Sequence, residues 1–151
     1  MAITITTAMP TSFKVEILKA VHNFTASTGN TFKIALFKAT ASGSGTFGAA
    51  TTNYSQMSTD QLSTASGYTQ PGNTLVSVTP VADGTTAVCD FADTSWTSAS
   101  FTTCGALIYN STASGAACAV LSFGGDQSVS SGDFTIQFPA PAASTAIIRI
   151  A

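Results

Sequence analysis

Charged residues are scarce in this sequence, at 8% of 151 residues, where soluble proteins ordinarily have about a quarter. Four of the five cations lie within the first 38 residues, and the formal net charge is only -2. Binding to a phosphate backbone needs several cations on one surface, so nucleic acid is not an expected partner. A weakly charged surface also does little to keep molecules apart, which favours self-association or a place in a larger assembly.

Groups that perform catalysis or hold metals are also few. His22 is the only histidine, and without a nucleophile motif such as GxSxG we expect it to pack at the edge of a helix. The three cysteines form no CxxC pair, which indicates reduced thiols and not a disulfide framework or a zinc site. Glycine-rich phosphate loops are absent as well. We therefore expect no cofactor, no metal, no catalytic residue and no enzymatic activity.

Long apolar runs are missing too. No stretch approaches the ~18 apolar residues of a membrane-spanning helix, and the start, MAITITTAMP, lacks the features of a secretory signal. These absences predict a protein made in the cytoplasm, with no membrane partner. Apolar residues nevertheless total 44%, which is the opposite of a disordered composition and suits one core. We expect a single domain over residues 1–151.

The apolar pattern divides this domain into an N-terminal part and a long run of strands. Residues 1–10 read as an arm, residues 11–25 as an amphipathic helix, residues 32–37 as a strand and residues 41–56 as a long Gly/Ser/Thr-rich loop or arm. From residue 73 to 151, alternating segments separated by turn residues predict further strands. These segments are 74–79, 86–91, 102–109, 117–123, 133–138 and 145–150.

Strands at this regular spacing predict a mainly β fold, a β-sandwich or a jelly-roll-like domain, with one N-terminal amphipathic helix. Gly124-Gly125-Asp126 is typical of a hairpin turn between two of the strands. A calcium loop there is less favoured, because the alternating DxDxDG ligands are missing.

Several segments together resemble a group of small virion structural proteins of tailed bacteriophages. They are Ser12–Leu18, Thr31–Phe37, Gly105–Asn110, Leu121–Asp126, Gly132–Pro139 and Ala146–Ile150. Within that group the chain is most similar to a capsid decoration or cement protein. The resemblance implies an oligomeric protein on the capsid surface of the virion that stabilises the capsid by binding subunits of the major capsid protein.

On this hypothesis the arm and the loop reach onto neighbouring subunits. The candidate interface residues are Met1, Ala2, Ile3, Thr4 and Ile5 in the arm, Phe47 and Tyr54 in the loop, and Trp96. One alternative is a tail component, or a receptor- or glycan-binding module that uses Trp96, Tyr54, Tyr68 and Tyr109 as aromatic platforms. A small hydrolase using Asp90 and Asp93 has less support, because no matched acid–base pair is evident.

Overall fold

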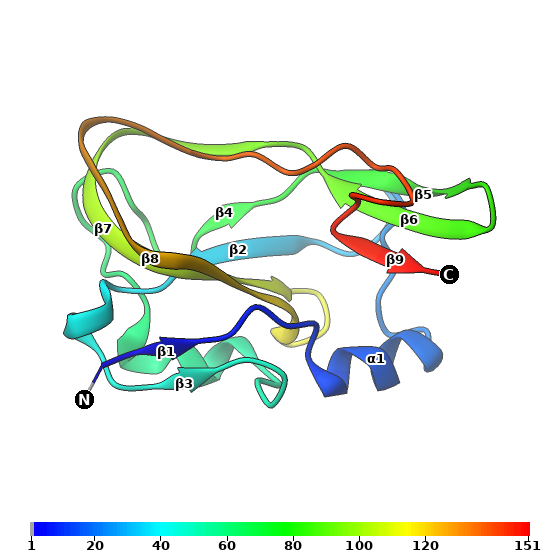
Figure 1. The fold of residues 1–151 in the computed structure, drawn as a ribbon, viewed down its shortest axis with the longest axis horizontal. Coiled ribbons are helices and arrows are strands. Elements are labelled where there is room, and N and C mark those ends of the chain that lie inside the picture. Colours follow the sequence, from blue (N-terminus) through cyan, green and yellow to red (C-terminus); the bar gives the residue numbers. More distant parts are fainter. Residues whose placement is uncertain (1) are drawn as a thin grey trace.

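The computed structural model describes residues 2–151, and these residues form a mainly β structure, as expected (Figure 1). The largest sheet has the antiparallel order β4-β2-β7-β8, made of Asn73–Thr74, Phe32–Leu36, Thr94–Asn110 and Ala116–Ile136. A second antiparallel sheet has the order β5-β6-β9, made of Ser77–Asp83, Thr86–Phe91 and Ile148–Ile150. Two short parallel strands, β1 (Thr4–Ile5) and β3 (Thr46–Phe47), lie beside them.

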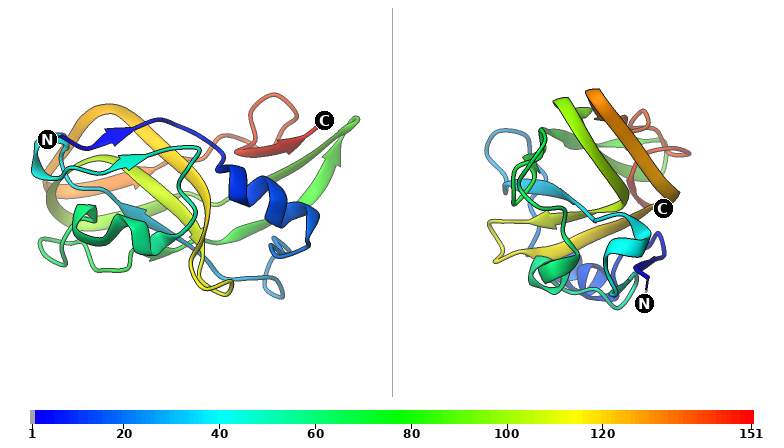
Figure 2. Two further views of the ribbon diagram at one scale, coloured as in Figure 1. Left: turned by 90° about the horizontal axis from the view of Figure 1, so that it is seen from below. Right: turned by 90° about the vertical axis from the view of Figure 1, so that its left-hand side faces the viewer.

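Strands β7 and β8 form one long hairpin that bends sharply along its length (Figure 2). Gly105 pairs with Ser122 but Thr103 pairs with Gln127, so four residues of β8 face one residue of β7. Gly124 and Gly125 lie within this bulge with φ values of 76° and 151°, which only glycine adopts readily. The hairpin turn expected at Gly124-Gly125 is therefore wrong. The strands expected over 117–123 and 133–138 belong to the single strand β8.

The other strand predictions differ in accuracy. Those over 32–37 and 86–91 are confirmed by β2 and β6. The segment 74–79 instead divides between β4 and β5, the segment 102–109 is the second half of a longer β7, and the segment 145–150 shortens to β9.

Helix α1 covers Thr11–Leu18, so the helix expected over residues 11–25 is too long. The Val21 N–H donates to the Glu16 carbonyl and the Ala20 N–H to the Ile17 carbonyl, which is the hydrogen-bond pattern of a Schellman cap. Ala20 holds the left-handed position of this cap, with φ 56°. Glycine usually occupies that position, so the sequence contains no sign that the helix ends here.

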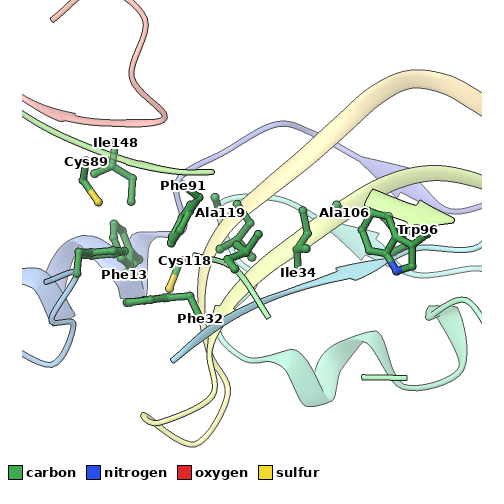
Figure 3. Packing of buried hydrophobic residues seen from close by; sticks show 14 of the residues in the cluster. Phe13, Phe32, Ile34, Cys89, Phe91, Trp96, Ala106, Cys118, Ala119 and Ile148 are labelled. Carbon is green, nitrogen blue, oxygen red and sulfur yellow. The ribbon is translucent and has the colours of Figure 1, made fainter. Parts of the chain in front are cut away.

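The main core lies between α1 and the two larger sheets. Phe24 and Phe32 stack with their ring centroids 4.3 Å apart, and Phe91 from β6 packs 5.6 Å from Phe32. Figure 3 shows Phe13, Cys118 and Ile148 converging on the same space from α1, β8 and β9. One aromatic core thus joins the four-stranded sheet, the three-stranded sheet and the helix.

The expected loop over residues 41–56 folds against the body of the protein. It contains β3 and parts of two short 3-10 helices, η1 (Thr40–Ser42) and η2 (Tyr54–Asp60). Asn53 and Gln56 form a capping box at the start of η2. Phe47 joins Ile3 in a second buried cluster, beneath β1 and β3. The segment is irregular, as predicted, but it is docked and does not extend as an arm.

Candidate functional site

The N-terminal interface candidates pack along their own chain. The Ile3 N–H donates to the Thr40 carbonyl at 2.9 Å, and Ile3 is buried. Thr4 and Ile5 pair with β3, which leaves Thr4 exposed and Ile5 half-buried. Ala2 is exposed, whereas Met1 lies outside the described residues. Ile3, Thr4 and Ile5 thus complete a sheet and a core within their own chain. The expected contact of this segment with neighbouring subunits stays a prediction.

The aromatic interface candidates belong mainly to the core. Phe47 packs against Phe37 with ring centroids 4.5 Å apart, and Trp96 packs 6.1 Å from Phe134. Tyr54 is half-buried and stacks on Tyr109 at 4.4 Å. Phe47, Trp96, Tyr68 and Tyr109 are all buried. Of the four aromatic side chains that a glycan-binding module would present, Tyr54 alone keeps part of its surface exposed.

A buried polar cluster that the sequence did not reveal lies at the base of α1. His22 Nε2 is 2.8 Å from Glu16 Oε2, and His22 Nδ1 is 3.0 Å from Asn110 Nδ2. The Cys118 thiol lies 3.9 Å from the same Nδ1 atom. His22 follows the end of the helix and is buried, so its expected place at the edge of a helix face is wrong. The ring of Phe13 covers it, with centroids 4.8 Å apart.

The hydrogen bonds of Asn110 indicate which ring nitrogen of His22 acts as the acceptor. Asn110 Oδ1 accepts the Ala113 N–H at 3.1 Å, and Asn110 Nδ2 also donates to Asn30 Oδ1 at 2.9 Å. The amide cannot turn over without losing both bonds, so its NH₂ group faces His22 Nδ1. That nitrogen is then the acceptor in this hydrogen bond, and Nε2 is the ring nitrogen that faces Glu16.

A glutamate, a histidine and a cysteine in this order resemble the elements of a nucleophilic triad. Cys118, however, is fully buried, and burial raises the pKa of its thiol, with the nearby charge of Glu16 adding to the effect. Nucleophilic cysteines need the opposite, a lowered pKa and access to substrate. His22 Nδ1 already accepts from Asn110, so it is not free to take the thiol proton. The cluster instead connects α1 to the end of the β7–β8 hairpin.

The two aspartates of the hydrolase hypothesis each accept a hydrogen bond from their own chain, Asp90 in the interior and Asp93 at the surface. Asp90 is 1% exposed, and its Oδ1 accepts the Phe91 N–H while its Oδ2 has no partner among the described residues. Burial raises the pKa of the Asp90 carboxyl, and the charge of Asp93 raises it further. Asp93 Oδ1 accepts the Phe138 N–H at 2.9 Å.

Helix α1 and the three-stranded sheet lie at one end of the molecule (Figure 1), and exposed large apolar side chains occur there on more than one face. Leu18 on α1 is 88% exposed and Ile150 on β9 is 55% exposed. We call these side chains together the apolar end. They are Val15, Leu18, Val21, Val76, Val78, Val81 and Ile150, and among residues 2–151 these are all the large apolar side chains that are exposed.

Other kinds of site were sought in the same part of the chain. Residues 2–151 contain no group of three or more His, Cys, Asp or Glu side chains placed to hold a metal ion. No helix in that range has both the length and the apolar character required to cross a bilayer. Comparison with protein families, with curated proteins and with solved structures found no match.

Proposed function

We propose that this chain is a non-enzymatic structural subunit of a tailed-phage virion that decorates the capsid by binding major capsid protein and further copies of itself. The observation that carries the proposal is the apolar end, on a protein in which charged residues are only 8% of the sequence. Large exposed apolar patches mark interaction sites on otherwise soluble proteins. The phage setting is supported by the sequence resemblance alone.

A tail component would use the same kind of surface, so location on the particle separates these two roles. A glycan-binding module has less support, because Trp96, Tyr68 and Tyr109 are buried and stacking on a sugar requires an exposed ring. The packing of the chain therefore favours a role in assembly over a role in recognising a small ligand.

We also propose that the four-stranded and three-stranded sheets form a distorted β-sandwich. Its support is the shared core, in which Phe32 of one sheet packs on Phe91 of the other. Apolar faces of two sheets stabilise each other in this way in known sandwiches. The dominance of one long hairpin gives less support to a jelly-roll connection.

The test is immunogold electron microscopy of intact phage particles, with antibodies raised against the purified chain. Regular labelling over the head is the expected result. Labelling confined to the tail would overturn the decoration role and favour a tail component. Particles that carry no label, although the antibody recognises the protein in lysed virions and in infected cells, would place the chain inside the particle and also contradict surface decoration.

A further inference from the structure

The outer edge of the four-stranded sheet is covered along only part of its length. Strand β8 is the last strand of that sheet, and β7 is its neighbour. Near the start of β8 the outer edge is covered, because Ala8 and Val120 exchange two backbone hydrogen bonds and the Ala117 N–H donates to the Thr52 carbonyl. Among residues 2–151 no such pairing covers residues 133–137, which run along the top of Figure 1. We call residues 133–137 the open edge.

The backbone groups of Thr135, at the centre of the open edge, point away from β7. Opposite residues of an antiparallel pair either exchange two hydrogen bonds or point their groups away from each other. Thr135 is opposite Ser95, and the Ser95 carbonyl accepts from Asn73 Nδ2 of β4 at 3.0 Å. Strands β4 and β8 lie on opposite sides of β7, so this carbonyl points away from Thr135. The Ser95 and Thr135 hydroxyls are 2.7 Å apart, which fits the closer side chains of a pair without backbone bonds.

The rest of the open edge follows the same alternation. The Phe138 N–H donates to Asp93 Oδ1 at 2.9 Å, on the side of the strand that faces β7. Because backbone groups alternate in direction along a strand, those of Gln137 then face outward, as those of Thr135 do. Asp133 lies two residues before Thr135 and has the same orientation. The open edge thus presents the N–H and C=O groups of three residues to solvent.

Nothing in the sequence of the open edge blocks the addition of another strand. Native proteins commonly protect such edges with proline, lysine, bulges or very short strands. The open edge contains no proline and no lysine, and Asp133 is its one charged residue. In contrast, the outer strands β4 and β9 have two and three residues, and β5 contains Pro80, which has no N–H to donate. Among the outer strands of the two larger sheets, β8 is therefore the one suited to accept a partner.

We propose that the open edges of two copies of this chain pair as antiparallel strands about a two-fold axis at Thr135, which joins their four-stranded sheets into one. A two-fold contact requires a self-complementary surface. In this register Thr135 is opposite its own counterpart, and Asp133 is opposite Gln137. Every outward N–H and C=O group of the open edge then has a partner. The inference rests on the proposed function, because it names one contact by which such a subunit binds further copies of itself.

The side chains of the open edge match this register. Asp133 and Gln137 are both exposed, and a carboxylate accepts a hydrogen bond from the amide group opposite it. Phe134 falls opposite Ile136, and aromatic and β-branched side chains stabilise each other across strands, as paired threonines do. The two Asp133 side chains lie four residues apart along the strands, or about 13 Å. That separation exceeds the Debye length of about 8 Å at physiological salt, so their repulsion is weak.

Neighbouring registers use the open edge less completely. An axis one residue earlier places Gln137 opposite Ser131, which has φ 50° at a register shift of β8. An axis one residue later places Asp133 opposite Pro139, which has no N–H to donate. The axis at Thr135 leaves no outward group of the open edge without a partner. The complementarity of the edge with itself is what commits it to a second copy of the chain.

The experiment measures the oligomeric state of the purified chain by sedimentation velocity over a range of concentrations. We compare the wild type with Thr135→Pro, and use Thr135→Val as a control because valine keeps the N–H and the β-branched shape. The wild type and the control are expected to dimerise. Thr135→Pro should lower the association constant at least about 10-fold, because the dimer loses two hydrogen bonds. Proline is tolerated on an edge strand where its missing N–H faces solvent, and circular dichroism checks that the variant folds.

Charge at Gln137 tests the register. Gln137→Lys places a lysine opposite each Asp133 and should raise the association constant roughly 2- to 30-fold, because two opposite-charge pairs form. Gln137→Asp places two carboxylates opposite each other at both ends and should lower it. Gln127→Lys makes the same change of net charge at an exposed position of β8 outside the open edge, and should leave the association constant unchanged. Equal association of the two Gln137 variants would overturn the register.

Other results would also overturn the inference. A monomeric wild type at every concentration tested, or a dimer that Thr135→Pro does not weaken, contradicts it. Binding of a monomeric wild type to major capsid protein, lost in Thr135→Pro, would instead assign the open edge to a strand of that protein. Failure here is distinct from failure of the proposed function, since labelling over the phage head does not depend on a dimer in solution.

Discussion

The buried amide of Asn110 is expected to be a main support of the fold. It makes three hydrogen bonds: with His22 Nδ1 at 3.0 Å, with Asn30 Oδ1 at 2.9 Å and with the Ala113 N–H at 3.1 Å. Asn110 is also the last residue of β7, just before the hairpin turn. Asn110→Ala therefore removes in one step the contacts that join α1, the segment before β2 and the turn.

The expected loss can be worked out from these bonds. Each hydrogen bond contributes about 1 kcal/mol net, and a buried group left without its partner costs more. Asn110→Ala should accordingly lower the free energy of unfolding by about 3 kcal/mol. In a domain of this size that corresponds to a fall of roughly 6–12 °C in the melting temperature. Equilibrium unfolding in urea measures the change directly, provided that the m-value stays constant.

Ser111→Ala is the matched control. Its hydroxyl donates to the Thr31 carbonyl at 2.9 Å from an exposed position next in the chain, so we expect a change within about 0.5 kcal/mol. If Asn110→Ala also cost less than about 1 kcal/mol, the three bonds would not stabilise the fold as described. The assignment of His22 Nδ1 as the acceptor would then lose its basis.

Two further predictions concern stability. Burial raises the pKa of the Asp90 carboxyl in the folded state, and the nearby charge of Asp93 adds to this. The contribution of Asp90 to the free energy of unfolding is therefore greatest below the pKa of this carboxyl in the unfolded chain, and it is lost as the pH rises through the folded-state pKa. The gain in unfolding free energy from Asp90→Asn should thus be larger at pH 7 than at pH 3.5; urea titrations at both pH values measure it, and an equal effect at both would contradict the argument. Ala20 has φ 56°, so Ala20→Gly should stabilise the protein by up to about 1 kcal/mol by relieving the left-handed conformation, and a lower urea midpoint for this variant would count against the cap described.

The sequence predicts elements well where one local pattern decides the outcome. Strand β2 alternates clearly and β6 lies between turn signals, and both were predicted within a residue of their bounds. The end of α1 could not be predicted, because alanine occupies the cap position where glycine would have indicated a stop. Gly124-Gly125 misled for the opposite reason, since a turn and a bulge both require glycine.

Contacts between distant residues decide the features that the sequence did not predict. The Thr40 N–H and hydroxyl both donate to Asp126 Oδ1 at 2.7 Å and fasten the corner of the hairpin, although the two residues are 86 positions apart. His22 and Asn110 are 88 positions apart. No spacing rule connects such pairs. The apolar end was not predicted, because apolar periodicity does not show which apolar residues stay uncovered.

The pairing of the largest sheet also constrains when the chain can fold. Residues 32–36 of β2 pair with residues 106–110 of β7, and their other neighbour, β4, has only two residues. During synthesis β2 therefore has only this two-residue partner until residues 106–110 have been made. The β7–β8 hairpin then closes through the short turn at residues 111–115, at little cost in loop entropy. We expect this sheet to assemble from the β7–β8 hairpin, with β2 joining afterwards, so that its order of formation runs against the order of synthesis.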